Sequence, residues 1–352
     1  MIDNILSRES VWEKLKLSGK PVVLYGMGNG ADMILDEFAA LGIKCSGVFA
    51  SDDFVRGQSF RGFKVEKLSD IEARLNDFTV AVGFATSLDS VIENIIAISK
   101  RRNLLVPCVP VYGKDIVNRE YIIENRAEIE EAYSLLCDEE SKLVFENSLR
   151  FMFGGELDVL LSTVSEKADV FKTFFKLNDS EDYLDLGAYR GDTIDEFLRF
   201  TNGKYSSITA VEPDEKTFKK LKQYCDKIAA CSCINACVSD VDGLLKFNNS
   251  AGRQSSISTN GKEVESLTVD TVCKSRGVTY LKADVEGSEK QMLLEAAETL
   301  KKYRPKLNIS AYHRSEDFFR IPLLINRLNS GYKIYLRRHK YIPCWDLNYY
   351  CI

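Results

Sequence analysis

Tyr183-Leu-Asp-Leu-Gly-Ala-Tyr-Arg-Gly-Asp-Thr193 decides the fold of this chain, together with Val211-Glu-Pro-Asp214 further on. An apolar segment ends in an acid and two small residues, another glycine opens a helical pattern, and a second apolar segment stops at Glu212. This is the layout of a nucleotide-binding β-α-β unit. In such a unit the glycines let the backbone approach a ligand, and the acid after the second strand accepts hydrogen bonds from ribose hydroxyls.

The glycine turn differs from the Gly-x-Gly-x-x-Gly pattern of dinucleotide sites, because Asp185 precedes Gly187 in it. A pyrophosphate in such a turn needs backbone amides and no competing anion. The carboxylate favours a ligand that is cationic at this point, and S-adenosylmethionine carries both a sulfonium and an ammonium group. We therefore expect S-adenosylmethionine as the cofactor.

Bulk composition sets the class of protein. The 352 residues are long for one hydrophobic core and comfortable for two, and 45% apolar with 28% charged residues is typical of a globular protein. The net charge of -5 leaves no basic footprint, which argues against nucleic acid as a partner. No apolar run approaches the roughly 18 residues of a membrane span, and Met1–Asn4 has no basic segment leading into an apolar one, so we expect a cytoplasmic protein.

The ten cysteines are scattered between Cys45 and Cys351, without a Cys-x-x-Cys pair. Cys231, Cys233 and Cys237 cluster, but their intervals do not match those of zinc sites and no histidine lies nearby. We interpret the cysteines as reduced, small apolar residues and predict no metal site.

The first half of the chain alternates predicted strands and helices. Gly26-Met-Gly-Asn-Gly-Ala31 is a glycine-rich turn between the first strand and a helix, and Asp52 follows the second strand. The alternation predicts a parallel sheet covered by helices on both faces. The expected strands are 22–25, 46–50, 79–83 and 104–107, and the expected helices are 2–17, 32–41 and 88–100.

Strand signals disappear between residues 115 and 176, where 124–136 and 140–150 are charged amphipathic helices. They return at 183, 207–211, 233–238, 279–283, 307–312, 332–337 and 348–352, the last two as an antiparallel hairpin. We predict an α/β chain with two Rossmann-like doubly wound domains. The first is a Rossmann-like N-terminal domain over residues 1–114, and the second is a C-terminal domain over residues 177–352. A helical connector over residues 115–176 joins them.

Several segments of the second half carry a family resemblance. The most specific is Leu281-Lys-Ala-Asp-Val-Glu-Gly-Ser-Glu289, and the others are Tyr183–Ile194, Val211–Glu215, Ala236–Asp240, Leu267–Asp270 and Ile309–Arg314. From about Phe171 onward the chain resembles the class I S-adenosylmethionine-dependent methyltransferases, and more narrowly the FkbM-like methyltransferases, which commonly have isoleucine at the position of Val285. The first half resembles, more weakly, Rossmann-like domains attached to enzymes of nucleotide-sugar and cell-surface glycan biosynthesis.

The resemblance implies a methyltransferase, and we expect an O-methyltransferase whose acceptor is a hydroxyl, first of all that of a sugar in glycan or natural-product biosynthesis. Glu212 follows Gly187 by about 25 positions, close to the spacing at which an acid holds the ribose. Asp185 is expected near the methionine moiety, with a helix cap as the alternative. Ser239 and Asp240 follow the third predicted strand and would read the adenine edge, with a simple turn as an equal alternative. The predicted cofactor-binding residues are Asp185, Gly187, Ala188, Gly191, Asp192, Thr193, Glu212, Pro213, Ser239, Asp240 and Asp284.

The predicted catalytic residues are His313, Asp284 and Glu286. Asp284 and Glu286 end the fourth strand beside the switch point of the sheet, so Asp284 should face the methyl group, unless the two acids only cap a helix. His313 ends the fifth strand, and with a reference pKa near 6.5 it can be neutral at pH 7 and accept a proton, unless it is only a packed polar residue. Lys282 lies on the same side of its strand as Asp284, which makes an ion pair the plain expectation.

Three alternatives stay open. A divalent cation could be held by Asp284, Glu286 and His313. A nicotinamide-dependent enzyme could use the turn at 26–31, although no histidine precedes His313. A non-catalytic module could dock in a biosynthetic assembly through the helical connector. The sequence decides neither the methyl acceptor nor between a monomer and a homo-oligomer.

Overall fold

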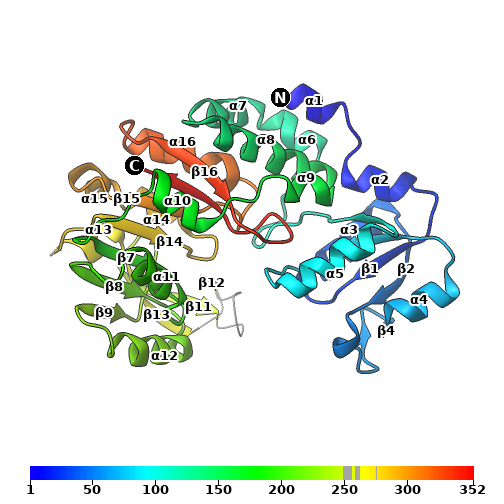
Figure 1. Ribbon diagram of the computed structural model, residues 1–352, viewed down its shortest axis with the longest axis horizontal. Helices are drawn as coiled ribbons and strands as arrows, with labels where there is room; N and C mark the ends of the chain where they lie inside the picture. The colour runs from blue at the N-terminus through cyan, green and yellow to red at the C-terminus, as the bar shows by residue number, and fades with distance from the viewer. Residues whose placement is uncertain (249–255, 258–261, 275) are drawn as a thin grey trace. The chain divides into compact units, whose positions relative to one another are not determined.

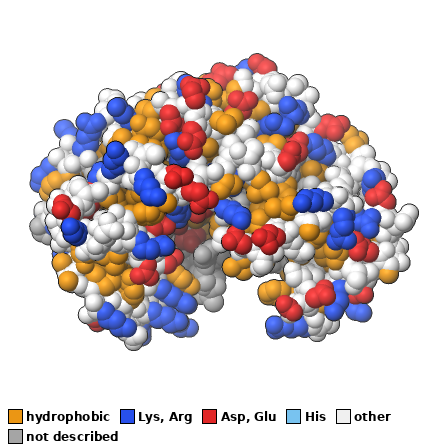
Figure 2. Space-filling view, in the orientation of Figure 1, with side chains coloured by type: hydrophobic (Ala, Val, Ile, Leu, Met, Phe, Trp, Pro, Cys, Tyr) orange, Lys and Arg blue, Asp and Glu red, His pale blue; other side chains and the backbone are white. Residues whose placement is uncertain are grey.

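The structure is a computed structural model that describes residues 1–248, 256–257, 262–274 and 276–352 (Figure 1). The chain forms two compact units. The first contains Met1–Ala127, Lys142–Val164 and Arg338–Asp346, and the second contains Glu128–Ser141, Ser165–Arg337 and Leu347–Ile352. Figure 2 shows acidic and basic side chains interspersed over the visible face. Among the described residues, no helix combines the length and the apolarity needed to cross a bilayer.

The first unit is built on a six-stranded sheet with the order β3-β4-β2-β1-β5-β6. Neighbouring strands are parallel except β3, which is antiparallel to β4. Every residue of β1 and β5 is buried, as expected for central strands covered on both faces. The strands are β1 Val22–Tyr25, β2 Cys45–Phe49, β3 Ser59–Phe60, β4 Phe63–Glu66, β5 Thr79–Val82 and β6 Asn103–Leu105, and the helices are α3 Asn29–Leu41, α4 Leu68–Arg74, α5 Asp89–Ser99 and a 3₁₀ helix Asp52–Phe54.

The predicted helix over 2–17 is two helices, α1 Ile2–Leu6 and α2 Val11–Leu17. Ser10 caps the second of these helices, since its hydroxyl accepts from the backbone N–H of Glu13 at 3.2 Å. The Glu13 carboxylate accepts from the N–H of Ser10 at 2.6 Å in return. This capping box starts a new helix although the apolar periodicity runs on across the break.

Helices fill residues 115–176, but the two units share them. α6 Arg119–Glu124 and α9 Leu157–Leu161 belong to the first unit and α10 Lys167–Thr173 to the second. α7 Arg126–Ser134 lies mostly in the second unit and α8 Glu139–Gly154 mostly in the first. Near the other end of the chain, Ile342 forms an antiparallel bridge with Thr86, so residues 338–346 return to the first unit.

The second unit holds a seven-stranded sheet with the order β16-β17-β15-β14-β7-β8-β9. β17 is antiparallel to β15, and the pairs from β15 to β9 are parallel. Lys333 and Ile352 exchange two backbone hydrogen bonds of 2.8 and 3.1 Å beside β16 and β17, as an antiparallel pair would. The strands are β7 Asp182–Leu186, β8 Ser207–Val211, β9 Cys231–Ile234, β14 Tyr280–Ala283, β15 Lys306–Ser310, β16 Ile334–Arg338 and β17 Leu347–Cys351, and the helices are α11 Asp192–Phe200, α12 Glu215–Cys225, α13 Val269–Cys273, α14 Glu289–Leu294, α15 Ala297–Lys302 and α16 Asp317–Leu328.

The strand order reverses between β14 and β7, and stacked aromatic rings fix this pair. The ring of Tyr183 on β7 lies 4.7 Å from that of Tyr280 on β14, and 4.4 Å from that of Phe197 on α11. All three side chains are buried. Their packing holds the two strands in register at the switch point, where ligands bind in open α/β sheets.

The predicted third strand over 233–238 is wrong in its second half. β9 ends at Ile234, because the Asn235 side chain turns away and donates to the carbonyl oxygens of Glu212 and Pro213 at 2.9 and 3.1 Å. The next strand along the chain is β10, Cys237–Val238, which belongs to a separate four-stranded sheet. That sheet has the order β10-β13-β11-β12 and contains β10 Cys237–Val238, β11 Gly243–Asn248, β12 Ser256–Ile257 and β13 Lys262–Leu267.

Candidate functional site

Acidic residues collect at the carboxyl ends of three adjacent strands. Asp185 lies one residue before the end of β7, Glu212 follows β8, and Asp284 follows β14. Parallel strands bring these ends to one edge of the sheet, next to the switch point. His313 follows β15 at the same edge.

The glycine turn after β7 is packed against the end of β14. Gly187 has φ +79, and a Cβ at this position would lie 1.9 Å from the carbonyl oxygen of Asp284. The N–H groups of Gly187 and Ala188 both donate to the carbonyl of Val211 at 3.0 Å. Gly191 has φ +95, and its Cβ would lie 2.5 Å from the Tyr224 ring. The chain's own close packing therefore requires both glycines.

Asp185 does not present an uncompensated charge. Its side chain is fully buried, the hydroxyl of Thr193 donates to one carboxylate oxygen, and the Lys282 Nζ lies 3.4 Å from the other. Burial raises the pKa of Asp185, while Lys282 and Thr193 oppose the rise. Burial lowers the pKa of Lys282, but Asp185 and Asp284 outweigh it and leave that pKa raised.

The ion pair of Lys282 thus differs from the plain expectation of a pair with Asp284. Lys282 stands opposite Asp185 across β14 and β7, so the neighbouring strand supplies its partner. The negative charge of Asp185, which distinguishes this turn from a dinucleotide site, is therefore offset by the positive charge of Lys282. Asp192, the first residue of α11, places another carboxylate near the positive end of a helix dipole.

Glu212 ties the glycine turn to the end of β8. It is 7% exposed, and its carboxylate accepts from the N–H of Tyr189 at 3.0 Å and from the N–H of Asp214 at 2.9 Å. Burial raises the pKa of Glu212 to about 7, although the two N–H donors lower it. A carboxylate offers about four lone-pair directions, so Glu212 can accept further hydrogen bonds beside these two. Pro213 then directs the chain to Asp214, which caps α12 by accepting from Thr217 at 2.8 Å.

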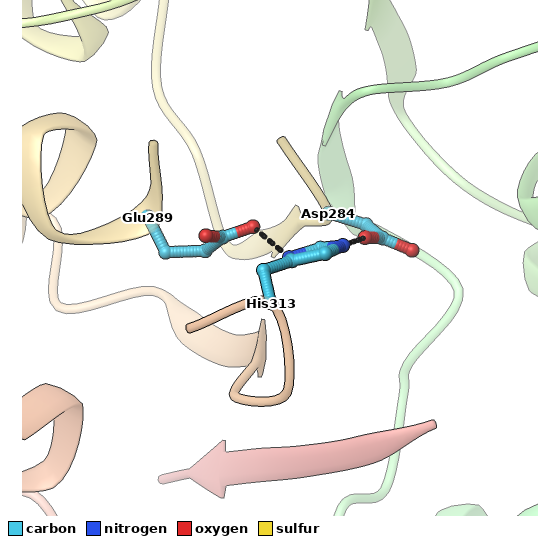
Figure 3. A group of neighbouring side chains, drawn as sticks. All are labelled: Asp284, Glu289 and His313. Carbon is cyan, nitrogen blue, oxygen red and sulfur yellow. Dashed lines mark hydrogen bonds and ion pairs between the residues drawn. The ribbon is translucent and has the colours of Figure 1, made fainter. Parts of the chain in front are cut away.

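His313 lies in the centre of a carboxylate cluster. The side chain is buried, and its Nδ1 is 2.8 Å from Oε1 of Glu289. On the opposite side of the ring, Nε2 is 3.3 Å from Oδ1 of Asp284 and 3.5 Å from Oε2 of Glu286. Figure 3 shows the ring between Glu289 and Asp284, with one nitrogen facing each. The three predicted catalytic residues therefore do meet, and Glu289 joins them.

The charge of His313 differs from the sequence expectation. Burial by itself lowers the pKa of the imidazole, but Glu289, Asp284 and Glu286 raise it to about 10. A pKa of about 10 favours the imidazolium form of His313 at pH 7, where the reference value allows a neutral ring. The three carboxylates stabilise the protonated form of His313. A higher pH would remove this proton, and another positive charge near the ring would lower the pKa of His313.

The loop after β14 is shaped by two consecutive left-handed residues, Glu286 with φ +54 and Gly287 with φ +87. A non-glycine residue in this region is strained, and such strain is concentrated at functional sites. The loop turns the Glu286 carboxylate back toward His313. The Tyr312 hydroxyl donates to both oxygens of Asp284 at 3.2 and 3.3 Å, which orients that carboxylate.

The sequence reasoning missed Glu289, Tyr312 and Asn235. Glu289 closes the Lys-x-Asp-x-Glu-Gly-x-Glu segment, and Tyr312 precedes the predicted histidine, so both stood inside quoted segments without a role. By contrast, Ser239 and Asp240 follow β10 of the small sheet and not the third strand of the large one. The Ser239 hydroxyl donates to Asp240 at 3.0 Å.

The turn in the first unit has glycine roles of its own. A Cβ on Gly26 would lie 2.4 Å from the Phe84 ring, and one on Gly30 would lie 3.1 Å from a backbone oxygen, which shows close packing of α3 on the sheet. Gly28 has φ +111 with nothing within 4 Å of its Cβ position. Asp52 starts a 3₁₀ helix and lies 3.5 Å from Lys67.

Comparison with known proteins identifies a related domain within the second half of the chain. A family model described as the methyltransferase FkbM domain matches residues 185–340, which contain Asp185, Glu212, Asp284, Glu286, Glu289 and His313. This part of the chain is similar to the methyltransferase FkbM domain. No curated protein matches the chain.

One solved structure shares the fold of this chain over its whole length. The crystal structure of methyltransferase FkbM from Methylobacillus flagellatus KT matches with a TM-score of 0.70 at 17% identity, covering 100% of this chain and 93% of that chain. Fibrillarin from Aeropyrum pernix, in complex with natively bound S-adenosyl-L-methionine, matches with a TM-score of 0.33 at 12% identity, covering 53% and 73%. An rRNA methylase from Streptococcus thermophilus matches with a TM-score of 0.33 at 12% identity, covering 50% and 87%.

Proposed function

We propose that this chain is an FkbM-like methyltransferase that uses S-adenosylmethionine to methylate a hydroxyl oxygen, with His313 as the general base. The observation that carries the proposal is the convergence of Glu212, Asp284 and His313 at the carboxyl ends of the parallel strands of one sheet, next to its switch point. A sugar hydroxyl in glycan or natural-product biosynthesis is the acceptor that the family resemblance favours. We place the reaction in the cytoplasm.

The residues divide into a ribose side and a methyl side. Glu212 accepts from the ribose hydroxyls, and the turn Gly187–Gly191 with Asp192 and Thr193 borders the methionine part. Pro213 fixes the direction of the chain after Glu212, and Ser239 with Asp240 stays our candidate for the adenine edge, since β10 starts three residues after β9 ends. Asp284 faces the sulfonium side, where its charge favours a cationic donor.

S-adenosylmethionine supplies a methyl carbon on a positively charged sulfur. As the acceptor oxygen forms its bond to that carbon, the carbon–sulfur bond breaks and the sulfur becomes neutral. His313 takes the hydroxyl proton at Nε2, the nitrogen that faces Asp284 and Glu286. Positive charge of the bound donor near Asp284 lowers the pKa of His313 from about 10, which frees Nε2 for this task. Most of the remaining rate comes from holding the two reactants in line.

The affinity for S-adenosylmethionine should fall as the pH falls through about 7. Burial raises the pKa of Glu212 to about 7, so the carboxylate that accepts from the ribose becomes protonated below that value. Between about pH 8 and about pH 5.5 the Kd should weaken by up to about 30-fold. Isothermal titration calorimetry of the full chain measures this dependence.

Glu212→Gln is the matched control for the affinity experiment, because it keeps the shape of the side chain and removes the titration. Its Kd should be weaker than that of the parent at pH 8 and nearly constant over the same range. No binding to the parent at millimolar S-adenosylmethionine would overturn the proposed function. Binding to the Gln variant as tight as to the parent would remove Glu212 from the ribose site.

A divalent cation is the second candidate for activating the acceptor, and a specific geometry favours it. Asp284, Glu289 and His313 offer ligand atoms that lie within 4.8 Å of one another. Glu289 and Asp284 face opposite nitrogens of the ring, so they would not bind the same ion through it. A single ion would be bound by His313 Nε2, Asp284 and Glu286. Oxygen-rich ligands with one imidazole suit magnesium or manganese.

Excess chelator should leave the methyl transfer rate unchanged, because the proposed mechanism moves the proton with His313 alone. The measurement is transfer of labelled methyl from S-adenosylmethionine to a glycan extract, with and without EDTA. Restoration of a chelator-suppressed rate by magnesium but not by calcium would assign the cluster to a cation instead. The same assay excludes a non-catalytic module as soon as any labelled product forms.

A further inference from the structure

We propose that Glu289 is the positioning residue of the methyl transfer site, holding His313 in the tautomer and orientation that expose Nε2 to the acceptor. The inference rests on the proposed function, in which His313 is the general base of the methyl transfer. The position of Glu289 itself follows from contacts within the second unit.

Glu289 makes two hydrogen bonds through a single oxygen. Its Oε1 accepts from the backbone N–H of Val285 at 2.9 Å and lies 2.8 Å from Nδ1 of His313. Both side chains are buried, at 0% exposure for Glu289 and 1% for His313. Glu289 is the first residue of α14, so the helix start and the β14 loop hold the carboxylate from two sides.

The two faces of the imidazole differ in the strength of their contacts. The contact with Glu289 is 2.8 Å to a fully buried carboxylate. The contacts with Asp284 and Glu286 are 3.3 and 3.5 Å, to side chains that are 32% and 29% exposed. A short, buried, charge-assisted hydrogen bond outweighs two longer and partly hydrated contacts. The proton on Nδ1 is therefore held, and the one on Nε2 is exchanged.

An ionised carboxylate only accepts hydrogen bonds, so Nδ1 must carry hydrogen while Glu289 is charged. When the ring loses a proton, the lone pair appears on Nε2, which faces Asp284 and Glu286. With the opposite tautomer, Nε2 would carry hydrogen and could not accept from a hydroxyl. Glu289 thus decides whether His313 can act as a base, without touching the acceptor.

A further buried carboxylate lies behind the pair. Asp317 on α16 is 2% exposed and accepts from the N–H of Arg314 at 2.9 Å. Burial and the charge of Glu289 raise the pKa of Asp317 to about 7, while His313 and Arg314 lower it. The charged groups around the ring are therefore Glu289, Asp284, Glu286, Asp317 and Arg314.

The experiment is nuclear magnetic resonance of the full chain labelled with ¹⁵N in the histidine rings, in excess chelator. The chain has two histidines, and the spectrum of His313→Gln identifies the signals of His313 by their loss. The parent should show a downfield proton on Nδ1 at neutral pH and a high titration midpoint for the ring. In Glu289→Gln the downfield proton should be lost, and the midpoint should fall by about one unit or more.

Glu295→Gln is the matched control, since Glu295 caps the same helix, is exposed, and has no contact with the ring in the described structure. It should leave the His313 signals unchanged. The rate of labelled methyl transfer should fall about 100-fold in Glu289→Gln, with the Kd for S-adenosylmethionine within about threefold of the parent.

Two results would overturn the role of Glu289. One is a His313 midpoint and Nδ1 proton that do not respond to Glu289→Gln in a protein that melts like the parent. The other is a parent spectrum in which Nδ1 carries no hydrogen. Calorimetry measures the binding of S-adenosylmethionine independently of the His313 signals. A loss of that binding would count against the proposed function, whereas unchanged His313 signals in Glu289→Gln would count against the role of Glu289.

Discussion

Replacing His313 with glutamine should lower kcat for methyl transfer by about 100- to 10,000-fold, which is the range that a positioned general base contributes. The side chain is buried beside Asp284 and Glu286, so glutamine keeps the volume and a hydrogen-bonding end while removing the basic nitrogen. The Kd for S-adenosylmethionine should stay within about threefold, because we propose that Glu212 and the glycine turn, and not His313, bind most of that molecule. Labelled methyl transfer and calorimetry measure the two quantities.

His339→Gln is the matched control, because His339 is the other histidine of the chain and is also buried. Its effect should be confined to stability, with kcat per folded molecule unchanged. An undiminished kcat in His313→Gln would mean that alignment of donor and acceptor suffices without a base. In that case the imidazolium would serve only as a structural cation between three carboxylates.

The pH dependence of the parent gives the sign of the His313 effect. The folded pKa of about 10 lies above the reference value of 6.5, so the imidazolium contributes stability that is fully present below about pH 6.5. That stability is lost as the pH rises through about 10. The basic form increases over the same interval, and the rate should therefore rise with pH while the stability falls. A rate that falls steadily from neutral to alkaline pH contradicts the assignment of a base.

The positions of the acids could be predicted because they depend on strand order alone. Asp185, Glu212 and Asp284 each stand at the end of an apolar segment, and parallel strands must deliver such ends to one edge. The partners of the acids could not be predicted. Lys282 pairs with Asp185 because the register of β14 and β7 places the two residues opposite each other. This register is set when the sheet assembles and cannot be read from either strand alone.

Glu289 escaped prediction for a similar reason. It reaches His313 only because Glu286 and Gly287 both adopt left-handed backbone angles, which reverse the chain between β14 and α14. A sequence pattern shows that a glycine permits such a reversal, but it does not show that a glutamate also makes it. The pKa of His313 depends in turn on that reversal, because it brings a third carboxylate to the ring.

The third strand shows how local chemistry overrides an apolar pattern. The run from Cys233 to Val238 is interrupted by Asn235, whose side chain binds the carbonyls of Glu212 and Pro213 and so takes the chain out of the large sheet. Asparagine favours such local hydrogen bonds over a strand ladder. The interruption also holds the segment after Glu212 in place, at the point where the ribose is expected.

Gly187→Ala should cost several kcal/mol of unfolding free energy and abolish binding of S-adenosylmethionine. The new Cβ would lie 1.9 Å from the carbonyl oxygen of Asp284, a backbone atom at the end of a registered strand. The N–H of Asp284 also donates to the carbonyl of Leu186 at 3.0 Å, so β7 and β14 cannot separate here without losing backbone hydrogen bonds. Overpacking costs about 1 to 3 kcal/mol and occasionally more, and the strain of a left-handed alanine adds to it.

Gly203→Ala is the control that isolates this contact. Gly203 lies in the same unit and has φ +72, close to the +79 of Gly187, but nothing lies within 4 Å of its Cβ position. Both variants share the strain of a left-handed alanine, about 1 to 2 kcal/mol. Urea unfolding should therefore show the Gly187 variant as the less stable by the cost of the collision alone, with normal binding of S-adenosylmethionine in Gly203→Ala. Equal losses in the two variants would mean that β14 yields to the methyl group, and that the end of β14 is not held against the glycine turn.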